Sequence, residues 1–559
     1  MILCLKKLMD RKTLLAFALI AIVLILTPWY MNLVAPIPEE DTPTSTELTQ
    51  EARAQQSTRT ALGATNTTIR SVEKNKQQSI NVGNSLFTAT LSNRGGGSFT
   101  SFILHQYSKH DSTKVNLIGE ENLDNMLVGF VSLDGDPVML DHNWLIDSQA
   151  SSLLVDRHEK SIAFKTFHNG NVVRKTFTIN PDSYQIGIVL SFEKPDRYIS
   201  RGQYIVSWAG GVASTEKNTK DEYTYFKGYA YLGDELLEPS APEGRVEIEK
   251  QTGNTLWTAI KTKYFISALI PETSAVGAEV LGSTIDGRPH FETRMRQNVS
   301  SSNRYNLYVG PLDYVRVESL GVGLENTMNL GWAIIRPLGR LVTWSLKKMY
   351  GIIPNYGLVV ILFAVLVKII LNPLTKKQMV STRKTQALQP HIQRLKEKYK
   401  NDPQKLNKAQ MALFKEKGVN PLGGCLPLLL QMPILITFFT VFRSTIEFRG
   451  APFFGWINDL SQPDTLTTIG GFPLNVLPFL MGATMFLQQK YMSPTTGDGG
   501  QQKFMLYAMN VFFLFLFYSF PSGLNLYYSV FNILSIVQQK YFIPEVSLSS
   551  SGKSANTSK

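Results

Sequence analysis

The sequence predicts a multi-pass α-helical membrane protein with six spans and a large antiparallel β-sandwich domain outside the cytoplasm. The run from Thr13 to Pro38 has no charged residue, and most other long apolar runs fall after residue 350. Between these regions, roughly 250 residues carry strand patterns and few helix signals. The mean hydropathy of −0.05 resembles that of a soluble protein because it averages the membrane-spanning and water-soluble parts.

The N-terminal segment predicts a membrane anchor. Basic residues between positions 6 and 12 precede the apolar run Leu14–Leu26, a pattern that signal peptides share. A small-residue cleavage site is lacking, because Leu33 stands where cleavage after Ala35 would need a small residue. We therefore predict an uncleaved anchor over residues 1–35 with its N-terminus in the cytoplasm. Residues 36–60 are rich in Pro, Thr, Glu and Gln, which predicts a flexible linker.

Residues 61–325 predict the β-sandwich domain. The stretches SYQIGIVLSFEK, QYIVSWAGG and RYNLYVGP alternate apolar with smaller or polar residues, as half-buried strands do. The domain contains neither of the two cysteines, which excludes a disulfide framework there. It has no metal-ligand spacing, phosphate loop or Ser/His/Asp constellation, and NRGGGS (93–98) predicts only a β-turn. We expect no catalytic residue, no metal and no cofactor.

Residues 326–350 predict an amphipathic helix lying in the membrane interface. Apolar residues share one face of this segment, whereas Arg336, Arg340 and Lys347 share the other. Two tryptophans in the segment suit the headgroup region. A soluble amphipathic helix packed on the β-domain is the alternative.

Five further spans are predicted after residue 350, and with the anchor they place both termini on one side. They are Pro354–Leu374, Leu422–Phe442, Phe472–Leu487, Phe504–Phe520 and Ser522–Val537. The loop 376–420 carries 12 basic and 3 acidic residues, whereas the loop 443–471 carries 2 basic and 3 acidic ones. The positive-inside rule places loop 376–420 and both termini in the cytoplasm, and the β-domain in the periplasm. Residues 351–543 then form a five-span core, and residues 544–559 a disordered cytoplasmic tail.

Loop 376–420 predicts a cytoplasmic hairpin of two antiparallel helices with a bend at Pro390. Asp402 suits an N-cap, Pro403 the first helical position and Gly418 a C-cap. Its basic side chains suit ribosomal RNA or anionic lipid, although a solvated face that only sets the topology is the alternative. The basic residues predicted to make such contacts are Lys376, Lys377, Arg383, Lys384, Arg394, Lys396 and Lys398.

Lys368 interrupts the first of the five spans. Its long stem could bend toward the cytoplasmic headgroups, which is the simplest interpretation. The functional interpretation is an ammonium group that faces a wet cavity inside the protein. The five spans contain no Asp or Glu that could pair with it. Polar residues that could line a hydrated groove around it include Gln431, Thr484, Asn525, Tyr528 and Asn532.

The motifs NPLTKKQ, VNPLGGCLPLLLQMPI, MFLQQKYMSPTT and FPSGLNLYYSVFNILSIVQQ resemble the bacterial branch of the YidC/Oxa/Alb membrane-protein insertases. The resemblance covers about residues 350–542, and the preceding segments resemble its Gram-negative form. It implies a five-helix insertase core in the bacterial inner membrane, with a hydrophilic groove closed toward the periplasm. The family usually has Arg in this groove, where this chain has Lys368. Arg and Lys are not equivalent donors, although both supply the positive charge.

The resemblance also implies an insertase and chaperone that performs no covalent chemistry and acts alone or with the Sec translocon. Expected partners are nascent membrane proteins, the Sec translocon and its accessory subunits, the ribosome and membrane lipids, with no small-molecule substrate. Substrates are expected to slide along apolar residues of the third and fifth of the six spans and their neighbours. By the motif match these are Ala364, Met432, Pro433, Leu435, Met481 and Leu516. Ordinary helix packing is the alternative for these residues.

Two other classes of protein compete with this interpretation. A secondary transporter or anion channel is disfavoured because the chain shows no internal repeat, no paired broken helices and no intramembrane carboxylate for ion coupling. An intramembrane hydrolase would need Ser522 and Lys368 to form a Ser–Lys dyad. Because Ser522 begins a span at the periplasmic end and Lys368 lies toward the cytoplasm, we expect them to be far apart.

Overall fold

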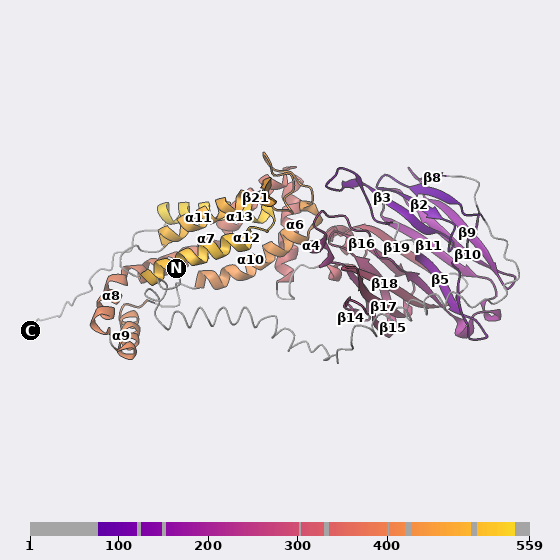
Figure 1. The fold of residues 1–559 in the computed structure, drawn as a ribbon, viewed down its shortest axis with the longest axis horizontal. Coiled ribbons are helices and arrows are strands. Elements are labelled where there is room, and N and C mark those ends of the chain that lie inside the picture. The colour runs from indigo at the N-terminus through magenta and orange to yellow at the C-terminus, as the bar shows by residue number, and fades with distance from the viewer. Residues whose placement is uncertain are drawn as a thin grey trace, which may run out of the picture. The chain divides into compact units, whose positions relative to one another are not determined.

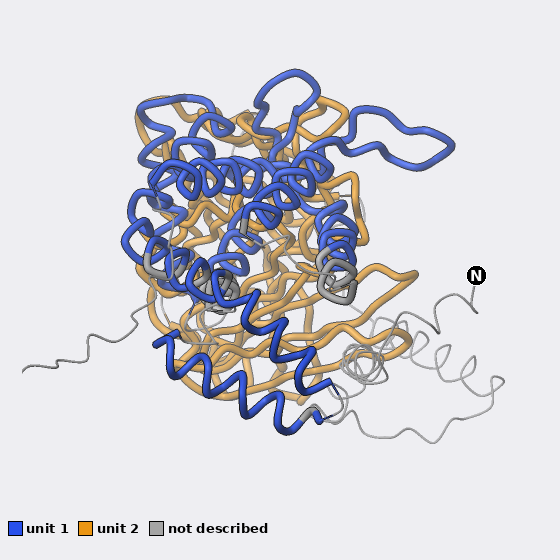
Figure 2. Tube along the Cα trace, turned by 90° about the vertical axis from the view of Figure 1, so that its left-hand side faces the viewer, with its two compact units in different colours: residues 1–48, 330–443, 447–559 blue, residues 49–329, 444–446 orange. Residues whose placement is uncertain are grey.

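The computed structural model describes residues 76–119, 124–147, 152–300, 303–328, 335–400, 402–419, 426–492 and 500–542. The predicted anchor, linker and C-terminal tail lie outside the described residues. The chain divides into two compact units (Figure 2). Residues 49–329 with 444–446 form the β-unit, and residues 1–48, 330–443 and 447–559 form the helical unit.

The β-unit contains two sheets (Figure 1). The smaller has the order β4-β3-β2-β1-β8, with strands Ser79–Gly83 (β1), Phe87–Ser92 (β2), Ser98–Ser108 (β3), Lys114–Asn116 (β4) and Ser152–Leu154 (β8). The larger has the order β6-β5-β12-β18-β17-β15-β16-β19-β11-β10-β9-β7, with β13 and β14 attached through β15. Strands β1 and β8 are parallel, so the prediction of a purely antiparallel domain is wrong at this edge.

Three strands of the larger sheet, those at residues 185–192, 203–208 and 303–311, match the sequence patterns that predicted them. The strands of this sheet are Asn125–Val131 (β5), Pro137–Met139 (β6), Leu145–Ile146 (β7), Lys160–His168 (β9), Asn171–Ile179 (β10), Gln185–Phe192 (β11), Gln203–Trp208 (β12), Lys227–Leu232 (β13), Glu235–Leu237 (β14), Glu247–Lys261 (β15), Phe265–Pro271 (β16), Ala275–Ile285 (β17), Arg288–Asn298 (β18) and Asn303–Pro311 (β19). Along β11 buried residues alternate with half-buried ones, as the period of two requires. The described part of the unit also contains two short α-helices, Thr219–Tyr223 (α4) and Tyr314–Glu318 (α5).

Aromatic side chains join the two sheets of the β-unit. The ring of Phe99 on β3 lies 5.9 Å from that of Phe177 on β10 and 6.3 Å from that of Trp208 on β12. Asn125 fixes this contact, because its amide donates to the Phe99 carbonyl over 2.8 Å and its oxygen accepts from the Phe99 N–H over 2.7 Å. The packed faces hold the core of the unit, and NRGGGS forms the predicted turn with positive φ at its three glycines.

The helical unit contains eight helices among the described residues. They are Arg336–Tyr350 (α6), Tyr356–Ala387 (α7), Gln389–Lys398 (α8), Pro403–Glu416 (α9), Leu426–Ser444 (α10), Leu477–Met492 (α11), Gly500–Phe517 (α12) and Ser522–Tyr541 (α13). Phe438 of α10 lies at the centre of the core, with its ring 5.8 Å from Phe363 on α7 and 4.3 Å from Tyr527 on α13. Helix α6 buries Val342 and Leu346 in the same core and exposes Trp344.

The structure corrects two predicted boundaries. Residues Phe472–Asn475 form strand β21, paired with Thr465–Ile469 (β20), so the predicted span that begins at Phe472 is wrong at its start. The turn at Gly470 and Gly471, both with positive φ, closes this hairpin, and helix α11 begins only at Leu477. Helix α7 does not end near Leu374 but continues to Ala387, so the predicted span and residues 376–387 of the predicted loop form one helix.

Among the described residues, one helix segment is long and apolar enough to cross a membrane by itself, namely Tyr356–Lys376. Pro433–Ser444 and Tyr507–Phe517 are apolar but shorter. The six-span arrangement therefore stays a prediction.

Candidate functional site

Lys368 lies on α7 and turns its side chain toward α13. Its Nζ donates a hydrogen bond to Ser535 Oγ over 2.7 Å and lies 4.7 Å from the centre of the Phe531 ring. The lysine is 7% exposed, whereas the next residue, Ile369, is 65% exposed. The ammonium group is therefore inside the helical unit, and the side chain does not extend along the exposed face as snorkelling would require.

The charge of Lys368 has only weak partners among the described residues. The hydroxyl of Ser535 already donates to the carbonyl of Phe531 over 2.7 Å, so its oxygen is free to accept from the ammonium group. The Phe531 ring adds a cation–π contact. Helices α7, α10, α11, α12 and α13 contain no Asp or Glu. A buried charge that keeps only a hydroxyl and a ring is incompletely compensated.

Two other polar residues join α13 to α11 near Ser535. Asn532, one turn before Ser535 on α13, donates to Thr484 Oγ1 of α11 over 3.3 Å, and both side chains are buried. We call Lys368, Ser535, Asn532 and Thr484 the Lys368 cluster. It combines the predicted groove residues Lys368, Thr484 and Asn532 and adds a serine.

Two predicted groove residues have a different environment, and a third falls outside the description. Asn525 donates to the carbonyl of Phe517 over 3.1 Å, so it joins α12 to α13 about 15 Å along the helix from Ser535. Tyr528 packs with its ring 5.7 Å from that of Phe517. The side chain of Gln431 lies outside the described residues. The structure therefore brings together only part of the predicted polar set.

The predicted slide residues separate into surface and core positions. Pro433 of α10 and Leu516 of α12 are exposed, and Leu435 is half-buried. Ala364 and Met481 are buried in the helical core, where the described conformation offers them no contact with a substrate. The side chain of Met432 lies outside the described residues.

The predicted hairpin forms from α8 and α9. Asp402 caps α9 by accepting from the Lys405 N–H over 3.0 Å, and Gly418 follows the helix with a φ of 61°, as predicted. The bend precedes Pro390, because α8 already begins at Gln389 with this proline in its first turn. Five of the seven predicted contact residues are exposed: Lys376, Lys384, Arg394, Lys396 and Lys398. The side chain of Lys377 lies outside the described residues, and Arg383 turns back toward α13.

In the turns of α7 that follow Lys368, the structure shows polar contacts that the sequence analysis did not predict. Gln538 of α13 donates to Asn372 Oδ1 and, over 3.3 Å, to Thr375 Oγ1, both on α7. Asn372 and Thr375 follow Lys368 at four and seven residues, so they lie on the same helix face. The spacing of Lys368, Asn372 and Thr375 could have indicated one polar face of α7. Their partner Gln538 could not be predicted in the same way, because it lies more than 160 residues away in the sequence.

The end of the helical unit opposite the hairpin is closed by the segment between α10 and α11. The N–H groups of Ser522 and Gly523, which begin α13, donate to the carbonyls of Gln462 and Leu460 over 2.7 and 3.0 Å. A Cβ on Gly523 would approach Phe442 to 2.9 Å, so only glycine fits this contact. Asp464 holds the segment in place by accepting from the N–H groups of Val476 and Leu477 at the start of α11.

The geometry excludes the Ser522–Lys368 dyad that an intramembrane hydrolase would need, and the two residues are far apart as expected. The hydroxyl of Ser522 donates to the carbonyl of Asp459 over 2.9 Å, and Lys368 contacts Ser535 instead, about 20 Å along α13. Ser535 is no substitute nucleophile, because it is 1% exposed and its hydroxyl proton is held by Phe531.

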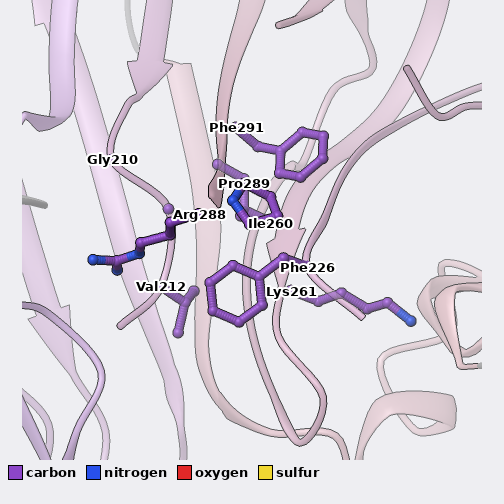
Figure 3. A pocket seen from close by; sticks show the side chains of 9 residues that line it. Gly210, Val212, Phe226, Ile260, Lys261, Arg288, Pro289 and Phe291 are labelled. Atoms are coloured by element: carbon purple, nitrogen blue, oxygen red, sulfur yellow. The ribbon is translucent and has the colours of Figure 1, made fainter. Parts of the chain in front are cut away.

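The β-unit has a shallow pocket lined by apolar side chains such as Phe226 and Phe291 and by two basic residues (Figure 3). The charged ends of Lys261 and Arg288 point away from each other in this pocket (Figure 3). The Nζ of Lys261 donates to the carbonyl of Thr327, so its charge is already engaged. The pocket therefore offers no converging set of polar groups for a small ligand.

Two family models match the chain. The model described as 60Kd inner membrane protein matches residues 348–547, and that described as YidC periplasmic domain matches residues 79–341. A membrane protein insertase YidC from Chlorobaculum parvum is 35% identical, over 96% of this chain and 95% of the relative. A protein of the same name from Chlorobium limicola is 33% identical, over 95% and 94%. The crystal structure of an active YidC insertase is 19% identical, covers 83% of this chain and 93% of its own, and gives a TM-score of 0.36.

Proposed function

Because the chain belongs to the YidC family of membrane protein insertases, we propose that it moves the polar flanks of its substrates past the Lys368 cluster. It is an inner-membrane protein with a periplasmic domain. One observation carries the proposal: a buried ammonium group whose partners, within the part of the chain that the structure describes, are a hydroxyl and an aromatic ring. Such an ammonium group can bind a carboxylate of the substrate without first breaking an ion pair.

The proposed step is an exchange of partners at Lys368. An acidic residue in the flank of an arriving segment replaces the Ser535 hydroxyl as the partner of the ammonium group. A charge at the centre of a membrane helix costs about 2.5–3.5 kcal/mol on insertion scales. Charge pairing lowers this cost for both groups while the flank is in transit, and Asn532 and Thr484 supply further hydrogen-bonding groups.

The apolar part of the substrate supplies the driving force. A segment of about 20 apolar residues gains free energy on entering lipid, at roughly 25 cal/mol per Å² of buried surface. In this proposal it passes the exposed Pro433 and Leu516, whereas Ala364 and Met481 would have to become accessible in another conformation. No nucleotide and no covalent step is needed.

The topology and the partners belong to the same proposal. Six spans would place both termini and the α8–α9 hairpin in the cytoplasm, where exposed basic residues such as Arg394 and Lys398 could meet the ribosome or anionic lipid. The Sec translocon and its accessory subunits are further proposed partners, and folding and assembly of inserted proteins a further role.

The test is an insertion assay in cells depleted of the native protein. Wild type, Lys368→Arg, Lys368→Gln and Lys368→Leu are supplied at matched levels, and protease protection scores one substrate with an acidic flank and one with a neutral flank. We expect Arg to restore insertion, and Gln and Leu to fail chiefly with the acidic substrate. If Leu inserts both substrates as well as wild type does, Lys368 has no role as a counter-charge.

A further inference from the structure

Strands β20 and β21 form an exposed hairpin at the closed end of the helical unit, away from α8 and α9 (Figure 1). Ile469 is paired with Phe472 next to the turn, and Thr468 with Pro473 one position further back. Because directly opposite residues of two strands share a face, Ile469 and Phe472 lie on one face and Thr468 and Pro473 on the other. Ile469 is 66% exposed and Phe472 63%. The tip of the β20–β21 hairpin therefore exposes two large apolar side chains on one face.

The β20–β21 hairpin also lacks charge. No charged residue occurs between Asp464 and Lys490. Turns of the β-unit differ: the one between β17 and β18 carries Asp286 and Arg288, and the one between β13 and β14 carries Asp234. Charged side chains keep exposed strands soluble and unpaired. An exposed hairpin whose tip is apolar and uncharged is instead typical of a surface that meets lipid or another protein.

The β20–β21 hairpin is held firmly against the end of α12. Asn475, at its base, donates its side-chain amide to the carbonyl of Tyr518 over 2.8 Å, directly after α12. The hydroxyl of Tyr518 donates to the carbonyl of Pro473, and its ring stacks on that of Phe472 with 5.4 Å between the centres. The face that carries Phe472 is therefore the face turned toward the helices.

Exposed apolar side chains continue from the β20–β21 hairpin onto the adjacent helix ends. Phe479 and Leu480 are exposed in the first turn of α11, and Phe515 is exposed in the last turn of α12. The ring of Phe479 lies 6.1 Å from that of Tyr518. Aromatic rings gathered at the ends of apolar helices are typical of a membrane–water interface. Since residues 348–547 match an inner membrane protein, lipid is the partner that this continuous apolar surface fits best.

We propose that the β20–β21 hairpin binds the membrane interface, with Ile469 and Phe472 inserted into the leaflet that adjoins the closed end of the helical unit. In the part of the chain that the structure describes, its sheet has only two strands, so both outer edges are open. Hydrocarbon cannot satisfy the backbone groups of open edges, whereas water and lipid headgroups can. The hairpin backbone therefore lies in the headgroup layer, and its apolar side chains reach the acyl boundary. The inference goes beyond the proposed function and does not depend on Lys368.

The test measures the depth of the hairpin in the full-length protein with Cys4→Ser and Cys425→Ser, in phosphatidylcholine nanodiscs that contain no other protein. An environment-sensitive fluorophore is attached through Ile469→Cys, through Thr468→Cys on the opposite face, or through the control Ile285→Cys. Ile285 is also exposed and also precedes a hairpin turn, but its turn is charged. Spin-labelled lipids carry the quencher near either end of the acyl chain. We expect blue-shifted emission at residue 469 and quenching several-fold stronger than at residue 285, chiefly by the shallow spin label. Residue 468 should be quenched less than residue 469.

A second measurement uses the unaltered protein, so that it decides the question if a labelled variant fails to fold. Phosphatidylcholine with a photoreactive diazirine near the glycerol is cross-linked in the same nanodiscs, and lipid adducts are mapped by mass spectrometry. We expect adducts on the peptide that contains Ile469 and Phe472, and none on the peptide that contains Ile285.

Three outcomes overturn the inference. If residue 469 behaves as residue 285 does and the hairpin peptide takes no lipid, the hairpin lies in water and its apolar face serves a protein partner. If the deep spin label quenches residue 469 most strongly, the hairpin does not lie at the interface. If residues 468 and 469 are quenched equally, the face that carries Ile469 and Phe472 does not orient the hairpin toward lipid.

Discussion

Lys175, in the core of the β-unit, should make the stability of that unit rise with pH. Its Nζ donates to the carbonyls of Gly95 and Met126 over 2.7 and 2.6 Å and lies 5.4 Å from the centre of the Trp144 ring. The residue is 1% exposed, and burial lowers the pKa of Lys175 from 10.5 to about 7.

The sign follows from proton binding in the two states. Between pH 7 and 10.5 the unfolded chain keeps the Lys175 proton and the folded chain releases it, so the free energy of unfolding increases with pH. Each pH unit in this window contributes about 1.4 kcal/mol. Below pH 7 both states are protonated and the full cost of burying the charge remains, about 5 kcal/mol for the whole shift.

The perturbation is Lys175→Met, measured by amide hydrogen exchange of β9 and β10 in the full-length protein in detergent. The variant lacks the ionisable group and leaves the carbonyls of Gly95 and Met126 unpaired, at about 1–3 kcal/mol each. The opening free energy of the wild type minus that of the variant should increase by about 2 kcal/mol from pH 7.5 to pH 9. Parallel pH profiles of the two proteins would refute the reasoning.

Two further predictions concern the closed end of the helical unit. Gly523→Ala should destabilise the full-length protein in detergent by about 1–3 kcal/mol, because the added Cβ would clash with Phe442. The control Gly482→Ala, whose Cβ meets only ordinary contacts, should shift the thermal unfolding temperature little, and equal shifts in the two variants would contradict the packing argument. Asp464→Ala should lower the free energy of unfolding by about 1–3 kcal/mol and speed hydrogen exchange at the Leu477 N–H, because it removes the acceptor at the start of α11. Asp464→Asn keeps an acceptor and should lower the free energy of unfolding less. Unchanged exchange in the alanine variant would show that Asp464 does not hold the start of α11.

Local chemistry made some features predictable from sequence. The alternation in β11, the glycine turn at 93–98 and the Asp402 cap depend on neighbouring residues, and each was confirmed. The start of α11 was mispredicted because Phe472–Asn475 is apolar like the helix that follows, although it forms a strand. Apolar composition alone does not separate a short strand from a helix turn.

The sequence predicted the charged residue of the candidate site but not the contacts around it, because those contacts join segments that are distant in the sequence. Lys368 stood out as a charge in an apolar run, but its partner Ser535 is 167 residues away. Arg383 was assigned to the hairpin by its basic neighbours, and its contact with Gln539 spans 156 residues. No local pattern specifies which face of α13 meets α7.

The buried lysines of the chain give the strongest reason to regard Lys368 as a site of exchange. Lys175 donates to two backbone carbonyls, Lys261 to the carbonyl of Thr327, and Lys263 pairs with Asp221 over 2.8 Å. Backbone carbonyls and a carboxylate are permanent, strongly polar partners that fix these lysines in the β-unit. Among the residues that the structure describes, Lys368 contacts a single hydroxyl and a ring, and helices α7 and α13, which make these contacts, contain no acidic residue. A lysine needed only for packing would gain stability from a carbonyl or carboxylate partner, and its replacement by an apolar residue of similar volume would cost little stability. A buried ammonium group whose contacts within the protein are weak is instead suited to bind a substrate group transiently.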